Sequence, residues 1–261
     1  MRVVVKVGGA ALDDKARLQD CVAAIAELVR NGHQVAVVHG GGSMLTRTLK
    51  LLGKPSEFVN ELRITDAETR DIALMVLAGK VNKTLVAALA AAGFAAIGLC
   101  GGDGMTFRAS KKRAAGLDLG FVGEICAVEP RWLHAIWNQD GIPVLAPMAL
   151  GLDGAYYNVN ADEMAAACAI ACSADELIFL TDVPGVKDAD GTIIRWLSVK
   201  DAEALATGSV ITGGMLPKLG ACRQALKAGV GRVQIMPAAQ AGCLSRADFA
   251  DLPCGTEVVS A

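Results

Sequence analysis

The sequence predicts an α/β fold in which two lobes share one continuous, mainly parallel sheet. A β-branched run at residues 3–7, a helical pattern at 14–30 and a second apolar run at 35–38 form a strand–helix–strand unit, so the sheet is parallel here. The pattern restarts late in the chain with a buried strand at 177–180. Because no low-complexity linker separates the halves, we expect one sheet rather than two independent domains.

The composition limits the kinds of partner. The chain has 261 residues, of which 53% are hydrophobic and 20% are charged, and a formal net charge of −2. Because no basic or acidic block occurs, we expect neither nucleic acid nor an anionic membrane as the main partner. The first six residues lack the apolar core of a secretory signal, which predicts a cytoplasmic protein. The eight cysteines form no C-x-x-C pair and are predicted to be small core residues.

Periodicity and turn signals place the other elements. Thr65 and Glu68 have the spacing of a capping box that opens a long helix from about 66 to 91. The apolar positions of this helix suit packing in the core and contact with a second subunit equally well. Residues 101–128 predict hairpins over the ligand-binding end of the sheet. Further predicted elements are helices at 43–53, 130–138, 198–206 and 214–228 and strands at 95–100, 142–146, 232–235 and 256–259.

The stretch 156–164 changes from an alternating strand pattern to a helix. Asn160, followed by Glu163, has the form of a capping box with Asn160 as the N-cap. Asp162 then lies in the first turn, where the positive end of the helix dipole favours a carboxylate. A simple helix start explains this pattern, and a functional acid at the junction of the two lobes explains it as well.

Glycine-rich turns recur at 8–9, 40–42, 101–104 and 213–214, next to the ends of predicted strands and helices. Open parallel sheets bind ligands at the carboxyl ends of their strands. Glycine leaves out the Cβ atom, so backbone N–H groups there can approach a phosphate closely. Neither a G-x-G-x-x-G fingerprint nor a P-loop occurs in the expected place, which excludes a simple Rossmann dehydrogenase and a P-loop enzyme.

Lys6 and Lys218 each lie close to one of these turns. Lys6 falls between two valines of the first strand, where a cation is costly unless it faces an anion. Lys218 falls in the first turn of a helix, where the dipole disfavours a cation unless a negative ligand is present. An edge-strand charge and an exposed helix residue are the simpler alternatives. The position of both lysines beside glycine turns favours an anion site.

Other polar groups are candidate carboxylate ligands. Arg63 can place its guanidinium on a carboxylate, or it can form a surface ion pair with a nearby glutamate. Asn158 and Asn160 offer neutral amides that can hold a second carboxylate. His39 either lines the site or packs within a turn. The sequence shows no Ser/His/Asp triad and no side chains with metal-ligand spacing.

Six motifs in chain order resemble the amino acid kinase family. They are V-K-V-G-G at 5–9, V-H-G-G-G at 38–42, L-R-I-T-D at 62–66, N-V-N-A-D at 158–162, T-D-V-P-G at 181–185 and G-G-M-x-x-K at 213–218. Together they span nearly the whole chain.

The resemblance implies a three-layer αβα sandwich around a mainly parallel central sheet. Residues 1–173 would bind the amino-acid substrate and form a homodimer through the 66–91 helix, and residues 174–261 would bind the nucleotide. The implied reaction is ATP-dependent phosphorylation of the side-chain carboxylate of N-acetyl-L-glutamate in arginine biosynthesis. ATP would be the co-substrate, Mg²⁺ would arrive with the nucleotide, and no protein side chain is assigned to a metal.

The resemblance also implies roles for single residues. Lys6 and Lys218 would stabilise the phosphoryl group during transfer, and Asp162 would orient both ammonium groups. The substrate would be bound by Gly41, Gly42, Arg63 and Asn158, with Asn160 in support. The nucleotide pocket would be lined by Gly8, Gly9, Asp182, Gly185, Val210, Ile211 and Thr212.

Two departures from the family pattern affect the expected substrate and assembly. Glu61 stands where the family commonly has glycine, which places a negative charge near the residues that would bind a carboxylate. The sequence begins directly at the first strand, without the N-terminal helix through which arginine-inhibited relatives form hexamers. We therefore expect a dimer that arginine does not inhibit.

Two alternative functions stay open at this point. The first is a kinase of an aminoadipate or glutamate group attached to a small carrier protein, as in lysine biosynthesis, with residues 111–113 (Lys-Lys-Arg) receiving the acidic carrier; an ordinary solvated hairpin also explains those charges. The second is a non-catalytic ligand sensor on the same fold. The joint presence of Lys6, Asp162 and Lys218 argues against it.

Overall fold

An eight-stranded sheet runs through both halves of the computed structural model, which describes residues 1–114, 117–208, 211, 213–240 and 255–260. The strand order is β12-β14-β13-β11-β1-β2-β8-β5, and all neighbouring strands are parallel except β13 and β14. The predicted mainly parallel sheet is confirmed. The strands are β1 (Arg2–Val7), β2 (Gln34–His39), β5 (Ala96–Leu99), β8 (Ile142–Leu145), β11 (Glu176–Thr181), β12 (Trp196–Ser198), β13 (Arg232–Pro237) and β14 (Thr256–Val259).

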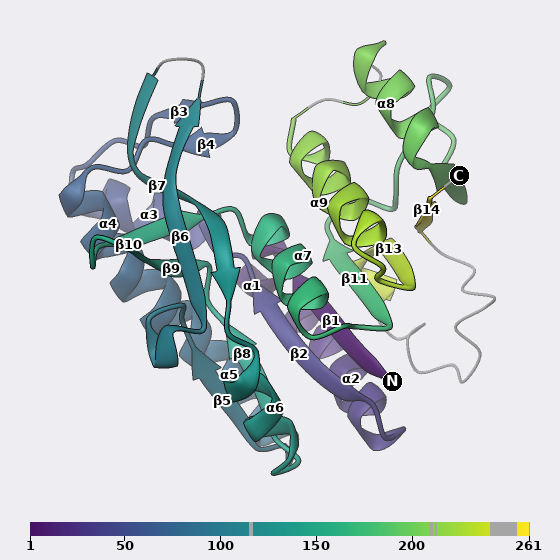
Figure 1. Ribbon diagram of the computed structural model, residues 1–261, viewed down its shortest axis with the longest axis horizontal. Helices are drawn as coiled ribbons and strands as arrows, with labels where there is room; N and C mark the ends of the chain where they lie inside the picture. The colour runs from purple at the N-terminus through teal and green to yellow at the C-terminus, as the bar shows by residue number, and fades with distance from the viewer. Residues whose placement is uncertain (115–116, 209–210, 212, 241–254, 261) are drawn as a thin grey trace.

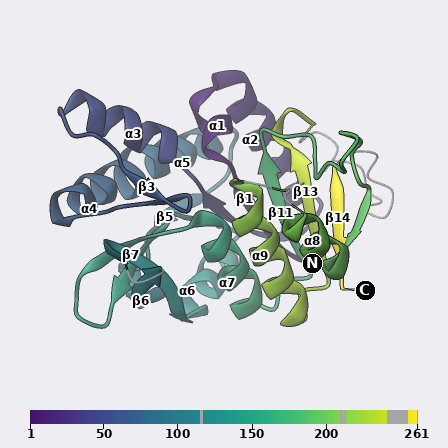
Figure 2. The same cartoon turned by 90° about the horizontal axis from the view of Figure 1, so that it is seen from above.

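Helices cover both faces of this sheet, so the molecule has three layers (Figures 1 and 2). One layer contains α1 (Gly9–Asp13), α2 (Lys15–Arg30), α3 (Gly42–Leu51), α4 (Ala67–Ala73), a π-helix η1 (Leu74–Val81) and α5 (Asn82–Ala91). The other contains α6 (Arg131–Trp137), α7 (Ala161–Ala171) and α9 (Met215–Lys227), with α8 (Val199–Thr207) beside α9.

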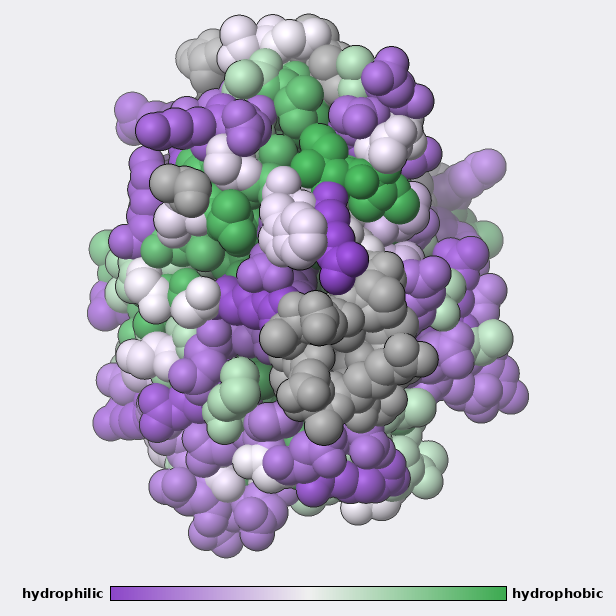
Figure 3. Space-filling model, turned by 90° about the vertical axis from the view of Figure 1, so that its right-hand side faces the viewer, coloured by the Kyte–Doolittle hydropathy of each residue, from purple (hydrophilic) through white to green (hydrophobic). Residues whose placement is uncertain are grey.

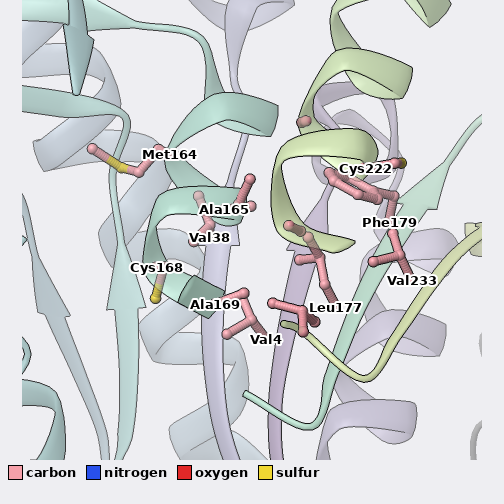
Figure 4. Packing of buried hydrophobic residues seen from close by; sticks show 14 of the residues in the cluster. Val4, Val38, Met164, Ala165, Cys168, Ala169, Leu177, Phe179, Cys222 and Val233 are labelled. Atoms are coloured by element: carbon pink, nitrogen blue, oxygen red, sulfur yellow. The ribbon is translucent and has the colours of Figure 1, made fainter. Parts of the chain in front are cut away.

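Side chains of β1 alternate between the two faces of the sheet, and each face packs against its own part of the hydrophobic core. Val3, Val5 and Val7 belong to the cluster that contains α2 and α5, whereas Val4 belongs to the cluster that contains α7 and α9. Figure 4 shows this second cluster, in which Ala165 and Ala169 of α7 lie close to β1 and β2. Because Lys6 alternates in step with Val4, its side chain points to the α7 face of the sheet.

Two further groups of strands, one of them mixed parallel and antiparallel, stand over the carboxyl ends of the central strands. The predicted hairpin is formed by β6 (Phe107–Ala114) and β7 (Leu117–Val128), which close a four-stranded barrel with β9 (Met148–Gly151) and β10 (Tyr156–Val159). A smaller hairpin joins β3 (Phe58–Val59) to β4 (Leu62–Arg63), and a short 3-10 helix η2 (Asp103–Met105) precedes β6.

The predicted capping box at Thr65 is wrong by one residue. Asp66 is the N-cap of α4, and its side chain accepts a hydrogen bond from Thr69 N at 2.8 Å. Thr65 is still extended, because its N–H donates to Leu119 O and its carbonyl accepts from Phe121 N of β7. The helix begins only where this pairing ends.

The predicted long helix is present as one continuous run, Ala67–Ala91, whose middle part is the π-helix η1. Its mean hydropathy of 1.6 over 18 residues and its length are also those of a helix that can cross a membrane, and 44% of that window is buried within the protein. Core helices of globular proteins meet the same criteria.

Five of the described cysteines are buried as predicted, at positions 21, 100, 168, 172 and 222. Cys126 is exposed, so the prediction is wrong there. It lies on β7, which is part of the barrel over the sheet rather than of the central sheet. Cys243 and Cys254 lie outside the described residues.

Candidate active site

Two glycine turns meet at one edge of the sheet, because β1 and β2 are parallel neighbours that end there. A Cβ atom on Gly40 would lie 2.9 Å from Gly9 N, and one on Gly9 would lie 3.2 Å from Gly41 N. Only glycine at both positions permits this contact between backbones. The turn at Gly8 also donates its N–H to Leu180 O of the next strand, at 2.9 Å.

Lys6, Asp162 and Lys218 meet beside these turns. Lys6 Nζ lies 2.8 Å from Asp162 Oδ1, and Lys218 Nζ lies 3.1 Å from Oδ1 and 3.0 Å from Oδ2. The three residues come from β1, α7 and α9, whose chain positions are far apart. Lys218 also lies over the ring of Phe179, 5.0 Å from its centroid.

This cluster is buried and carries an excess of positive charge. Lys6, Asp162 and Lys218 are 9%, 6% and 6% exposed. Burial raises the pKa of Asp162, but the two lysines lower it by more, so the acid is ionised. Burial and then Lys6 lower the pKa of Lys218, and Asp162 opposes that shift. Two cations against one carboxylate leave a buried site that an anion would stabilise.

The start of α7 positions Asp162. Asn160 Oδ1 accepts hydrogen bonds from Asp162 N at 2.8 Å and Glu163 N at 3.2 Å, so the predicted N-cap is confirmed. The Glu163 side chain does not complete the capping box, because it pairs with Lys112 of the β6–β7 hairpin at 2.5 Å. The cap orients the helix so that its first acid faces both lysines.

A cavity of about 170 Å³ opens next to the cluster. All five residues predicted to bind substrate line it, together with the β3–β4 hairpin and Pro147. His39 does not line it; this histidine is fully buried behind the turn. The five residues are Gly41, Gly42, Arg63, Asn158 and Asn160.

Arg63 is held in this cavity by oxygen atoms rather than by an acid. Its guanidinium donates to Thr46 Oγ1 at 2.7 Å, to Gly42 O at 3.2 Å and to Ser56 Oγ. The alternative of an ion pair with Glu61 or Glu68 is wrong, because within the described part of the chain the guanidinium donates only to these neutral oxygens and Glu68 pairs with Lys54 at 2.6 Å. Arg63 is buried without an acidic partner among the described residues, so its charge is open to an incoming carboxylate.

Two helices that begin near the site, α3 and α9, have no side-chain cap. α3 and α9 start after Gly41 and Gly214, which offer no side-chain cap. By contrast, α2 and α8 start at Asp14 and Ser198, whose side chains accept from helix N–H groups. No side chain therefore occupies the first N–H groups of α3 and α9, which leaves them available to an anionic ligand except for Leu216 N, which donates to Gly213 O at 3.0 Å.

The predicted nucleotide residues are only partly brought together. Asp182 directly follows β11 beside the Gly8 turn, and Thr181 Oγ1 donates to Asp182 Oδ1 at 3.1 Å. Gly185 has a φ of +149° and packs against Thr256, where a side chain would not fit. Ile211 is buried. Val210 and Thr212 lie outside the described residues.

A second cavity, of about 150 Å³, lies between α8 and α9 and faces away from the lysines. Its α9 residues, Leu216, Leu219, Gly220 and Arg223, lie on the helix face opposite the buried residues that pack toward α7. Figure 3 shows this side of the molecule, with apolar surface gathered in the upper half, where α8 and α9 lie. It carries none of the predicted site residues.

Several contacts of the site had no signal in the sequence. Thr46 and Ser56 hold Arg63, Lys112 holds Glu163, and Leu77 and Val81 of the π-helix pack against Gly41. These partners are 7 to 51 positions apart in the chain, so no local pattern links them.

Residues 1–237 match the model of the amino acid kinase family. Among curated proteins, the acetylglutamate kinase of Acidobacterium capsulatum is 63% identical over 260 residues, which span 100% of both chains. The acetylglutamate kinase of Koribacter versatilis is 50% identical over 260 residues, which span 100% of this chain and 99% of that protein.

Solved structures agree with these matches. The Streptococcus mutans protein smu.665 superposes with a TM-score of 0.85 at 26% identity and covers 100% of this chain and 99% of that one. An N-acetylglutamate synthase from Neisseria gonorrhoeae superposes with a TM-score of 0.87 at 25% identity, over 100% of this chain and 59% of that one. The chain therefore belongs to the amino acid kinase family.

Proposed function

We propose that the chain is an ATP-dependent kinase that phosphorylates the side-chain carboxylate of N-acetyl-L-glutamate, giving N-acetyl-L-glutamyl 5-phosphate in arginine biosynthesis. The observation that carries this proposal is the buried cluster of two lysines on one aspartate beside two glycine turns. The full-length relatives named acetylglutamate kinases support the choice of substrate.

The reaction needs no general base. A side-chain carboxylate has a pKa of about 4.3 and is already ionised at neutral pH, so it can attack phosphorus directly. The remaining task is to align two anions and to neutralise the charge on the phosphoryl group during transfer. Lys6 and Lys218 supply two cations for this, and Asp162 holds both at one point.

Electrostatics also explain why the cluster is arranged around a single acid. When the phosphoryl group is present, its negative charge balances the second lysine. The same charge raises the pKa of Lys218 and so opposes the lowering that burial causes. Both Asp162 oxygens are occupied by ammonium groups, so Asp162 is not suited to hold a metal ion. We assign Mg²⁺ to the nucleotide, with which it would enter as part of the co-substrate.

N-acetylglutamate would bind in the cavity that residues of the 1–173 lobe line. Arg63 offers a buried guanidinium to one carboxylate of N-acetylglutamate, and the uncapped start of α3 at Gly41 and Gly42 offers N–H groups. Asn158 and Asn160 line the same cavity. The nucleotide would lie over residues 174–261, next to Asp182 and the start of α9.

The ion pairs at residues 111–113 give little support to the carrier-protein alternative. Lys111 pairs with Asp118 at 2.7 Å and Lys112 pairs with Glu163 at 2.5 Å, so two of the three cations at 111–113 already have acidic partners. The sensor alternative leaves unexplained why two lysines are buried on one acid, an arrangement that costs several kcal/mol without a further anion.

An exposed apolar surface on the 67–91 helix supports the proposed homodimer. Met75 in the middle of this helix is 64% exposed, and less than half of its most apolar window is buried within one chain. A second copy that packs against this helix would remove that surface from water.

Trapping of the acyl phosphate by hydroxylamine tests the proposed function. With Mg·ATP, the purified protein is expected to form hydroxamate from free N-acetylglutamate, and not from glutamate or aminoadipate attached to a carrier protein. Preferred turnover of the carrier-linked substrate would select the carrier-protein alternative. Absence of turnover with either substrate would select the sensor.

A further inference from the structure

His39 is a fully buried histidine at the end of β2, directly before the Gly40–Gly42 turn. Its Nδ1 lies 2.6 Å from Gly40 O, and its Nε2 lies 3.2 Å from Asn82 Nδ2. The same Asn82 nitrogen lies 2.9 Å from Val144 O. A histidine, an asparagine and two carbonyls thus form one buried chain of polar groups behind the candidate site.

The hydrogen-bond partners determine which ring nitrogen of His39 carries the proton. Val144 O can only accept, so the Asn82 atom that faces it is the amide nitrogen, whose second hydrogen points to His39 Nε2. Nε2 must then be an unprotonated acceptor, and the proton of the neutral ring is on Nδ1. Nδ1–H faces Gly40 O, which also can only accept. Both ends require the same tautomer.

A charged imidazolium does not fit this arrangement. It would place an Nε2–H against the N–H₂ group of Asn82, with two donors facing each other. Burial, and in addition the charge of Lys6, lower the pKa of His39 to about 4. The ring therefore stays neutral across the pH range in which the enzyme would work.

The hydrogen bond to Gly40 O also sets the direction of a donor in the site. Gly40 C=O and Gly41 N–H belong to one trans peptide, so they point in opposite directions. Gly41 N lies at the contact with the Gly8–Gly9 turn, and no acceptor among the described residues receives its N–H. Holding Gly40 O on one side therefore aims Gly41 N–H at the site on the other.

We propose that His39, held by Asn82 as the Nδ1–H tautomer, is a positioning residue that aims Gly41 N–H at the anion bound in the site. This inference rests on the proposed function and adds to it two residues, from β2 and from the start of α5. It also explains the place of Asn82, a buried amide on a helix that is otherwise largely apolar.

The tautomer is tested by nitrogen NMR of protein with ¹⁵N-labelled histidine. One histidine is expected to show the neutral Nδ1–H pattern, unchanged between pH 5.5 and 8, and its signals should vanish in His39→Asn. A His39 signal that titrates near pH 6.5, or that shows the Nε2–H tautomer, would overturn the assignment. This measurement does not depend on kinase activity.

Kinetics of matched variants test the positioning role. His39→Asn retains an amide donor near the Nδ1 position, whereas His39→Gln retains a polar group near Nε2 and loses the donor to Gly40 O. We expect kcat to fall by about 10-fold or more in His39→Gln and in Asn82→Ala, and by less in His39→Asn. A misdirected Gly41 N–H loses part of the transition-state stabilisation that would be lost if this donor were removed. The partly exposed His134, changed to Gln, is the control.

The melting temperature and KM of each variant separate positioning from folding. Variants that fold like the wild type and lose kcat with little change in KM for ATP support the proposal. Equal kcat in His39→Gln and wild type would overturn it. A wild type that forms no acyl phosphate at all would overturn the proposed function together with this role, while the NMR result would still report the tautomer.

Discussion

Single residues carry the electrostatics of the candidate site. Lys6 points to the α7 face of the sheet because side chains alternate along β1, and there it contacts Asp162 at the start of α7. Lys218 occupies the first turn of α9, where the dipole disfavours a cation. Asp162 compensates both unfavourable positions at once.

Removing either lysine should abolish most of the activity. Lys6→Ala and Lys218→Ala are each expected to lower kcat at least about 100-fold, because each removes one cation aimed at the developing charge. Steady-state kinetics on folded variants would measure this. Lys227→Ala, at the exposed end of the same helix α9, should leave kcat unchanged. Near-normal kcat in either site variant would contradict the assignment.

At the scale of the element, the turn of the β3–β4 hairpin places Glu61 at the rim of the substrate cavity. The β3–β4 hairpin has a two-residue turn, Asn60-Glu61, with φ values of +48° and +65°. Such turns favour glycine at the second position, so Glu61 is strained there. Its Oε1 lies 3.8 Å from where a Cβ of Gly213 would be, at the rim of the substrate cavity.

Two substitutions at position 61 separate strain from charge. Glu61→Gly should raise stability by up to about 1 kcal/mol by relieving the strain, and should lower KM for N-acetylglutamate by about threefold by removing repulsion of an anionic substrate. Glu61→Gln should lower KM alone, without raising the melting temperature. Equal melting temperatures of Glu61→Gly and wild type would contradict the strain, and unchanged KM in both would contradict the charge effect.

The cap of α7 links stability to catalysis. Asn160→Ala is expected to cost about 1 kcal/mol of unfolding free energy and also to lower kcat, since Asp162 N loses its acceptor. Ser198→Ala removes the corresponding cap of α8, where Ser198 Oγ accepts from Asp201 N at 3.0 Å. It should cost similar stability and leave kcat intact. Denaturant unfolding and kinetics on both variants would check this; equal kcat in the two would refute the link.

The stability of the whole molecule should depend on one buried acid far from the site. Burial raises the pKa of Glu176 from 4.5 to about 7, although Arg232 opposes the shift, and Glu176 Oε2 has no hydrogen-bond partner among the described residues. The folded state binds this proton more tightly than the unfolded state. The contribution of protonated Glu176 to the free energy of unfolding is therefore complete below about pH 4.5 and is lost as the pH rises through 7.

Glu176→Gln should remove this pH dependence. At pH 8 the variant is expected to be more stable than the wild type by up to about 3 kcal/mol, and at pH 4.5 the two should be similar. Urea unfolding at pH 4.5 and pH 8 would measure the difference. Glu203→Gln, a change on exposed α8, is the control. An equal gap between wild type and Glu176→Gln at both pH values would contradict the prediction.

Assembly is also a property of the whole molecule. Light scattering should show a dimer for the wild type and a monomer for Met75→Glu, because a charge in the middle of the 67–91 helix would be buried against its copy. Leu152→Glu, at a position 69% exposed in the β9–β10 turn, should remain a dimer. A wild type that is monomeric, or a Met75→Glu variant that remains a dimer, would contradict the expected assembly.

Local pattern was sufficient where a feature depends on neighbours in the chain. Alternating or β-branched runs between glycine turns predicted the strands, and Asn160 before Asp162 and Glu163 predicted the cap of α7. The two lysines stood out because each is unfavourable in its own element. Local pattern failed at Thr65, whose backbone pairs with β7 and delays the helix to Asp66.

The sequence by itself therefore determined the parallel sheet and the glycine turns at the carboxyl ends of its strands, since these follow from propensity and periodicity. It also singled out Lys6 and Lys218, because a cation is unfavourable at each position within its own strand or helix. Only the tertiary structure decided that Lys6 and Lys218 share Asp162, that Glu163 faces Lys112 and that Asn82 holds the tautomer of His39. These contacts join side chains from separate elements, and their geometry is set by how the elements pack, which short-range pattern does not contain.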